Sequence, residues 1–243
     1  MDGLFAYQAG HSLLHRLNPL TKLVTAACAA VAAFAWPDAR LALALAGLLL
    51  LLAASAGVLG SVLRPALTAL TPLAVALFGV HSLFYPGRET PLLILGPVTV
   101  WREGVAFAFL ILCRVAVLML SALTTMATTH PRHLSIALVE KGLSPKAAYV
   151  FMAALQFIPE MQQRSRAILE AQQARGLETA GSLWRRLKAF VALMGPLIIG
   201  ALIATETRAL GLEARGFSRT GPRTFLTDVP DTRWERTWRW CAV

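Results

Sequence analysis

The sequence of 243 residues is 56% apolar and only 15% charged, which excludes an ordinary soluble domain and indicates membrane-spanning helices. In a soluble chain, the net charge of +10 would suggest nucleic-acid binding. Base stacking requires aromatic residues interleaved with basic ones, and only the Trp/Arg cluster at 233–240 comes near this pattern. We interpret that cluster as an interfacial anchor and expect no nucleic-acid partner.

In chain order, the first elements we expect are four transmembrane helices. A span needs about twenty apolar residues, and shorter runs can be extended by their flanking turns. A turn at Trp36-Pro37-Asp38 should separate the first two helices, and residues 57–60 should separate the second from the third. The longest loop should open at residues 85–89 and close at 101–103. The four apolar runs are residues 21–36, 39–57, 66–85 and 104–126.

The Lys and Arg residues predict the orientation of these helices. Bases dominate the side of the membrane that holds the N-terminus and the segment after the fourth run, whereas acids balance the bases on the other side. Because cytoplasmic loops carry the excess of Lys and Arg, we expect a multi-pass protein of the cell (plasma or inner) membrane with a cytoplasmic N-terminus. The basic markers of this side are His15, Arg16, Lys22, Arg64, Arg132, Lys141 and Lys146.

Arg114 is a charged residue inside the fourth apolar run. Such residues face a partner or a cavity, so both a transport role and a structural role are open. We favour the structural role, in which Arg114 extends to the interface or pairs with a loop acid such as Glu103. His130 and His133 are close in sequence, but Pro131 lies between them, and we interpret them as loop residues rather than metal ligands.

Beyond Ala127 the chain becomes amphipathic. Residues 131–140 predict a short helix that Lys141-Gly142 closes. Ser144-Pro145 predicts the start of a longer helix, with Ser as its cap and Pro at its first position. That helix is apolar up to Ile158-Pro159 and then polar, and its apolar part of about a dozen residues is too short to span a membrane.

Residues 182–215 repeat this design with a basic start, an apolar stretch at 189–205 and a charged end. Gly195-Pro196 interrupts the apolar stretch, whose length is marginal for a span. Two arrangements remain open: the stretch crosses the membrane once, or it forms a helix buried at the cytoplasmic face. We favour the second arrangement.

A repeated tripeptide ends both of these helical stretches: Ala174-Arg175-Gly176 and Ala214-Arg215-Gly216. Gly can adopt the left-handed conformation that stops a helix, and the Arg before it then lies at the exposed end of a rigid rod. The guanidinium presents a fork of donors that fits a carboxylate. Two such ends predict a doubled docking site for a paired soluble partner; chance and simple capping are the alternative explanation.

Signatures of catalysis are missing from the sequence. It has no phosphate-binding Gly-x-x-x-x-Gly-Lys-Ser/Thr loop, no His-Glu-x-x-His and no Gly-x-Ser-x-Gly. The four apolar runs contain no acidic residue that could hold a metal ion inside the membrane. Its three cysteines match neither a disulfide framework nor a metal site. We therefore predict no catalytic residue, no cofactor and no metal site.

Four motifs in order resemble the transmembrane (T) component of energy-coupling factor (ECF) transporters. Residues 12–22, Ser-Leu-Leu-His-Arg-Leu-Asn-Pro-Leu-Thr-Lys, resemble the N-terminal signature Ser-x-Leu-His-x-Leu-Asp-Pro-Arg-x-Lys. Phe157-Ile158-Pro159 resembles the aromatic-aliphatic-Pro step of that family. Residues 171–176 and 213–217 are similar to its two coupling motifs. The chain departs from the pattern at Asn18, Leu20 and Gln156, where Asp, Arg and Arg are usual, and many relatives carry one more membrane helix after about residue 243.

The resemblance implies an all-α polytopic membrane protein, with about four N-terminal transmembrane helices followed by long amphipathic coupling helices at the cytoplasmic face. Residues 1–128 would form the transmembrane domain and residues 129–243 the coupling domain. The implied function is a non-catalytic scaffold that links two ABC-type ATPase subunits to a substrate-binding membrane subunit, for uptake of a vitamin or a transition-metal ion. The six residues of the two tripeptides would bind the ATPases. A membrane-embedded enzyme and an ordinary ABC permease are the alternatives.

Overall fold

The computed structural model describes residues 7–8, 10, 12–85, 90–95, 98–177, 181–219, 221 and 231–242. The chain divides into two compact units. Unit 1 contains Met1–Gly142 together with Asp228–Val243, and unit 2 contains Leu143–Thr227. The boundary that we predicted after residue 128 divides a transmembrane domain from a coupling domain. The two compact units do not test this functional division, which stays a prediction.

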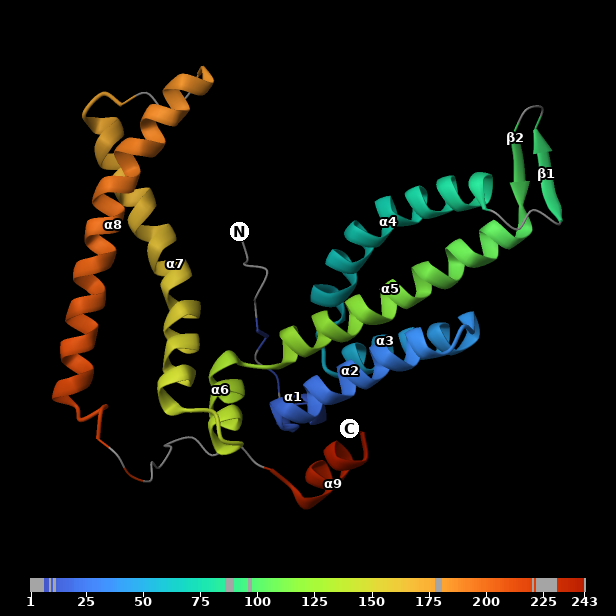
Figure 1. Ribbon diagram of the computed structural model, residues 1–243, viewed down its shortest axis with the longest axis horizontal. Coiled ribbons are helices and arrows are strands. Elements are labelled where there is room, and N and C mark those ends of the chain that lie inside the picture. Colours follow the sequence, from blue (N-terminus) through green and yellow to red (C-terminus); the bar gives the residue numbers. More distant parts are fainter. Residues whose placement is uncertain are drawn as a thin grey trace. The chain divides into compact units, whose positions relative to one another are not determined.

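Unit 1 is organised around one long helix, α5 (Arg102–Thr128), which packs against α2 (Pro19–Ala35), α3 (Ala39–Ser55) and α4 (Leu59–Phe84) (Figure 1). Small and β-branched residues such as Ala53, Val62 and Ala66 fill the contacts, together with Leu120, in one buried cluster. Small side chains let helix backbones approach closely, as in membrane helix bundles. The remaining helices of unit 1 are α1 (Leu13–Arg16), α6 (Pro131–Glu140) and α9 (Arg233–Ala242).

Three helices in the described part of the chain are long and apolar enough to cross a membrane: α4, α5 and α8 (Leu183–Ala214). The apolar helices α2 and α3 are shorter, at 17 residues each. This helix content confirms the predicted class, an all-α polytopic membrane protein. The third helix begins at Leu59, seven residues before the predicted start of its apolar run, and it continues through Pro65 and Pro72.

A small antiparallel hairpin between α4 and α5 was not predicted. Strand β1 (Pro91–Leu95) pairs with β2 (Val98–Trp101), and Leu95 lies opposite Val98. Two short apolar runs flank Gly96-Pro97 in the sequence, a pattern typical of a hairpin. The structure therefore places a hairpin between Tyr85 and Trp101, where we expected only a loop; residues 86–89, where that loop was to open, lie outside the described residues.

Helices α2 and α5 close each other's C-terminal ends. The Lys22 ammonium, near the start of α2, donates to the Thr128 carbonyl at the end of α5 at 2.9 Å. The Arg114 guanidinium, from the middle of α5, donates to the carbonyls of Ala33 at 3.0 Å and Trp36 at 3.2 Å, at the end of α2. The last carbonyls of a helix lack partners within it, and positive charge is favourable there. These contacts support the structural role that we favoured for Arg114, with backbone carbonyls as its partners in place of Glu103.

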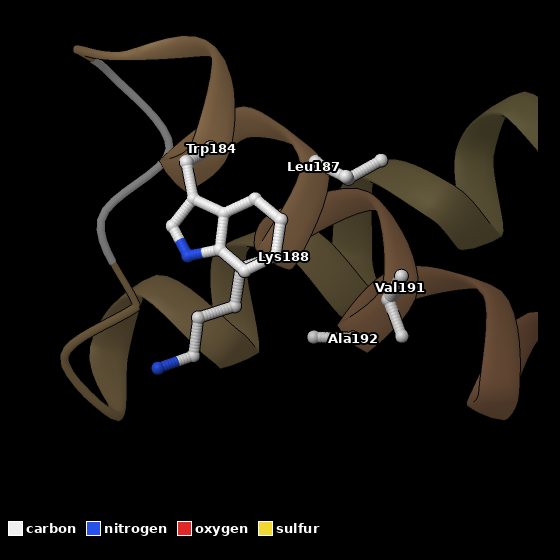
Figure 2. A pocket seen from close by; sticks show the side chains of 5 residues that line it. All are labelled: Trp184, Leu187, Lys188, Val191 and Ala192. Carbon is white, nitrogen blue, oxygen red and sulfur yellow. The ribbon is translucent and has the colours of Figure 1, made fainter.

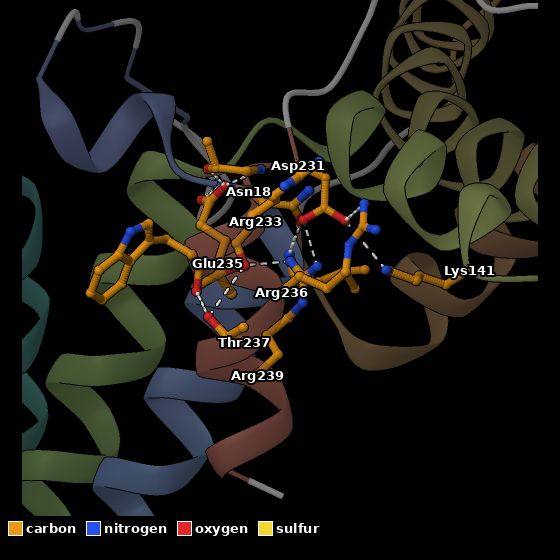
Figure 3. A network of polar contacts seen from close by, with 12 residues as sticks. Asn18, Lys141, Asp231, Arg233, Glu235, Arg236, Thr237 and Arg239 are labelled. Atoms are coloured by element: carbon orange, nitrogen blue, oxygen red, sulfur yellow. Dashed lines mark hydrogen bonds and ion pairs between the residues drawn. The ribbon is translucent and has the colours of Figure 1, made fainter.

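Helix α9 is attached to the start of α2 by a polar network (Figure 3). One Glu235 oxygen accepts from the Asn18 amide at 2.8 Å, and the other accepts from the Thr232 amide at 3.1 Å. Arg239 donates to Thr21 Oγ1 at 2.9 Å and to Asp231 at 2.5 Å. Burial acts to raise the pKa of Asp231, but hydrogen bonds from Arg239 and Lys141 outweigh it and hold that pKa below its usual value. The carboxylate therefore remains charged at neutral pH.

We predict that Arg114→Met lowers the thermal stability of the detergent-solubilised protein. The methionine keeps an apolar stem but leaves the carbonyls at the end of α2 without donors, at a cost of about 1–3 kcal/mol for each buried group. Such a loss lowers a melting midpoint by several degrees. Arg102→Met, at the exposed start of the same helix, is the matched control. An unchanged midpoint for Arg114→Met would show that the closure of α2 is not stabilising.

Candidate functional site

The two Ala-Arg-Gly tripeptides lie in unit 2, which consists of two long helices joined as an antiparallel hairpin (Figure 1). Helix α7 (Pro145–Ala174) begins as predicted, with the Ser144 hydroxyl accepting from the Ala147 amide at 3.2 Å and Pro145 in the first turn. Helix α8 continues unbroken through Pro196, so the expected interruption at Gly195-Pro196 was wrong. Helix α7 likewise contains Pro159 in its interior.

The two helices end in the same backbone conformation. Arg175 has φ −88° and ψ 11°, and Arg215 has φ −88° and ψ 6°. Each is followed by a glycine in the left-handed region, with φ +87° at Gly176 and +73° at Gly216. These angles confirm the prediction that glycine stops each helix.

Matching hydrogen bonds close both ends. The Gly176 amide donates to the Gln173 carbonyl at 2.9 Å, and the Leu177 amide donates to Gln172 at 3.0 Å. In α8, the Gly216 amide donates to Glu213 at 2.8 Å, and the Phe217 amide donates to Leu212 at 3.0 Å. This pair of bonds is the Schellman motif, in which the chain's own backbone satisfies the last carbonyls of the helix.

Both arginines are therefore left available for a partner. All six residues of the tripeptides are exposed, and the two guanidinium groups have no hydrogen bond or ion pair with any other described residue. A Cβ atom built on Gly176 or Gly216 would meet nothing within 4 Å, so the surface beside each arginine is open. The positive charge is favourable at the negative end of the helix dipole, which keeps each arginine compatible with its position.

The fold does not bring the two tripeptides together. The Phe217 ring, next to Gly216, lies 5.2 Å from the Tyr149 ring near the start of α7. Arg175 lies at the other end of α7, 26 residues further along, which corresponds to about 39 Å of helix. The hairpin thus has two separate arginine-bearing ends. One small ligand cannot contact both, whereas two copies of a partner can.

The sequence did not lead us to two other features of unit 2. Glu160 on α7 forms ion pairs with Arg164 and, across the helix crossing, with Arg208 of α8. The sequence feature that could have pointed to Glu160 is its isolation, because it is the single acidic residue between Lys141 and Ile168. The second feature is an open apolar hollow of about 360 Å³ on the first turns of α8 (Figure 2). Trp184, Leu187, Lys188, Val191 and Ala192 line it.

We predict that replacing a glycine by alanine lowers stability at the helix ends but raises it inside α8. Gly216→Ala, or Gly176→Ala on α7, forces a side chain into a left-handed conformation, at about 1–2 kcal/mol. Gly211→Ala, at an exposed position inside α8, gains up to about 1 kcal/mol because alanine favours helix. Amide hydrogen exchange measures the difference: the Phe217 and Leu177 amides should exchange faster in the respective tip variants and no faster in Gly211→Ala. Equal protection in all variants would contradict the assigned helix ends.

Comparison with known proteins agrees with this architecture. The model of the CbiQ family, described as cobalt transport proteins, matches residues 10–224. The energy-coupling factor transporter transmembrane protein of Limosilactobacillus fermentum is 32% identical over 226 residues, which cover 88% of this chain and 83% of that protein. The corresponding protein of Bacillus subtilis is 30% identical over 230 residues, covering 90% and 85%.

A further relative is an ABC transporter ATP-binding protein of Bifidobacterium longum, which is 34% identical over 230 residues. The match covers 88% of this chain but only 28% of that longer protein. The family model and the transmembrane relatives each extend over most of the chain, and the family model includes both helix ends with their tripeptides. The chain therefore belongs to the CbiQ family of cobalt transport proteins, as a transmembrane component of an energy-coupling factor transporter.

Proposed function

We propose that this chain is the scaffold that transmits motion from two ABC-type ATPase subunits to a substrate-binding membrane subunit. One observation carries the proposal: two helices end in the same closed backbone, and each presents an exposed arginine next to an open surface. Arg175 and Arg215 would each form a charge-assisted pair with a carboxylate in a groove of one ATPase. Ala174, Gly176, Ala214 and Gly216 would let the ATPase surface approach the helix ends.

The relative from Bifidobacterium longum supports ATPase partners. Its name describes an ATP-binding protein, and a segment similar to this chain occupies about a quarter of it. This chain lacks the phosphate-binding loop, so the similar segment is not a source of ATP binding. In that relative, ATP binding and the similar segment belong to one protein. We infer that separate subunits supply ATP binding here, and that this chain is not itself an enzyme.

The exposed apolar surface of unit 2 supports a membrane-embedded partner. Large apolar side chains of α8 are more than half exposed, and the hollow of Figure 2 lies among them at Trp184. Contiguous apolar surface of this kind marks an interaction site or lipid. We propose that the substrate-binding subunit and the bilayer cover it. The most exposed of these residues are Leu183, Trp184, Val191, Ile199, Leu202 and Leu210.

We further propose that α8 lies at the cytoplasmic face, although it is long and apolar enough to span. Its partner α7 runs antiparallel to it, and Arg164 of α7 donates to the Gly200 carbonyl in the apolar part of α8. Arg166 and Glu170 follow Arg164 on α7. A spanning α8 would draw these charges into the bilayer, which is costly. Residues 129–243 would then form a coupling domain, and residues 1–128 a transmembrane domain with a cytoplasmic N-terminus, in the plasma or inner membrane.

The transported substrate is either a transition-metal ion or a vitamin, chosen by the substrate-binding subunit. The family description as cobalt transport proteins favours the metal ion. The alternatives, a membrane-embedded enzyme and an ordinary permease, have less support. The described residues hold no group of three His, Cys, Asp or Glu side chains that could bind a metal ion, so no observation favours the enzyme.

Cysteine labelling in intact cells tests the orientation. In a background without the three native cysteines, Ser12→Cys, Ser182→Cys and Ser218→Cys should all resist a membrane-impermeant maleimide and react only after permeabilisation. Ser182 and Ser218 flank α8 and are exposed. External labelling at one of these two positions alone would show that α8 crosses the membrane, and the proposed placement of α8 would be wrong.

Charge reversal at both helix ends tests the docking itself. Losing one partner of a buried interfacial charge pair costs about 2–5 kcal/mol. A single Arg→Ala should weaken co-purification with the ATPases but leave a second anchor at high effective concentration. Arg175→Glu with Arg215→Glu should abolish co-purification and the ATP hydrolysis of the complex, because repulsion replaces attraction. Arg166→Glu with Arg219→Glu is the control with equal charge. If the double tip variant still binds both ATPases, the tripeptides are helix caps only.

A further inference from the structure

The crossing of α7 and α8 holds an ionic clamp, which we define as Glu160, Arg164 and Arg208. Arg164 donates through Nη2 to Glu160 Oε1 at 2.8 Å, one helical turn away on α7. Arg208 of α8 donates through its own Nη2 to Glu160 Oε2. Both oxygens of one carboxylate are thus occupied by arginines of two different helices, so the carboxylate joins the helices directly.

Two additional contacts orient the clamp. Arg164 Nη1 donates to the Gly200 carbonyl on α8 at 2.9 Å, so this arginine also bridges the crossing. The Arg208 guanidinium lies 5.8 Å from the centre of the Phe157 ring on α7. The three charged side chains are only partly exposed, and large apolar residues surround them along both helices. A carboxylate removed from this position would leave two arginines facing each other without a counter-charge.

The crossing of α7 and α8 lies equally far, in residues, from the two Ala-Arg-Gly ends. Glu160 precedes Arg175 by fifteen residues, and Gly200 precedes Arg215 by fifteen residues. Each arginine-bearing end is therefore about 22 Å of helix from the crossing. A rotation of about 10° at the crossing would displace each end by about 4 Å over a lever of that length. Such a displacement exceeds the range of a hydrogen bond, so the crossing angle decides whether both ends fit two fixed grooves at once.

We propose that Glu160 is a positioning residue that fixes the crossing of α7 and α8 and thereby the relative orientation of the two Ala-Arg-Gly ends. This inference rests on the proposed function, in which two ATPase subunits engage the two ends together. Glu160 does not touch the ATPases itself. It acts through Arg164 and Arg208, which hold the helices at one angle and allow the force received at one end to reach the other.

Distance measurement on the full chain tests the proposal without any partner. In a background without the three native cysteines, spin labels at Val150→Cys near the start of α7 and Gly211→Cys near the end of α8 report the crossing angle by pulsed electron–electron double resonance, because both positions are exposed and lie on the same side of the crossing. Glu160→Gln should broaden the distance distribution or shift its maximum, by about 3 Å for a rotation of about 10° over a lever of about 15 Å. Glu170→Gln, an exposed acid on the same helix, should leave it unchanged. An unchanged distribution for Glu160→Gln overturns the inference.

A charge-exchange variant distinguishes loss of the ion pair from general misfolding. Glu160→Arg with Arg208→Glu restores one ion pair across the crossing, and it should recover most of the narrow distribution that Glu160→Arg alone loses. Failure of this recovery, with helix content and elution volume unchanged, would also overturn the inference.

Assembly separates this inference from the proposed function. Glu160→Gln keeps both arginine ends, so each end can still bind one ATPase although the two no longer fit both grooves at once. The variant should therefore co-purify with the ATPases more weakly but detectably, while ATP hydrolysis by the complex falls at least tenfold. Full hydrolysis despite a broadened distribution would overturn the positioning role. If the unmodified chain binds no ATPase, the proposed function fails, and the distance measurement still decides whether Glu160 sets the crossing.

Discussion

The last carbonyls of a helix must find donors, and this chain meets that requirement in two different ways. In unit 1, Lys22 and Arg114 supply these donors. Each donates from one helix of the α2/α5 pair to the last carbonyls of the other. The pair is thereby fixed in antiparallel register, and α5, which every other long helix of unit 1 contacts, is held in place. In unit 2 the backbone closes the helix ends by itself, and Arg175 and Arg215 have no hydrogen bond or ion pair with another residue in the described part of the chain.

Features that depend on a few adjacent residues could be predicted from the sequence. The bounds of α6, the Ser144 cap and the closure of α7 and α8 by Gly176 and Gly216 all follow from local backbone preferences, and the structure agrees with each. The arginine at each end follows for the same reason, because the residue before a closing glycine lies at the exposed tip of the helix. These helix ends are local features, so a single sequence was sufficient to predict their backbone geometry.

Features that depend on distant residues could not be predicted in this way. Pro196 was expected to interrupt α8, but a helix of 32 residues packed along α7 tolerates the loss of one hydrogen bond. Arg114 was expected to extend to the interface or to pair with a loop acid such as Glu103, but it donates to the last carbonyls of α2 instead. Glu160 pairs with Arg208, 48 residues away, and no sequence period indicates which of the many arginines it contacts.

The bond between Asn18 and Glu235 joins residues 217 positions apart, and this separation sets an order of events during synthesis. At about 5–20 residues per second, roughly 10–40 s pass between the emergence of the start of α2 and that of its α9 partner. During this interval the Asn18 amide and the Thr21 hydroxyl lack the groups that bind them in the finished fold. The contacts between the start of α2 and α9 can therefore form only after almost the whole protein has been made, and a chain truncated within unit 2 cannot form them.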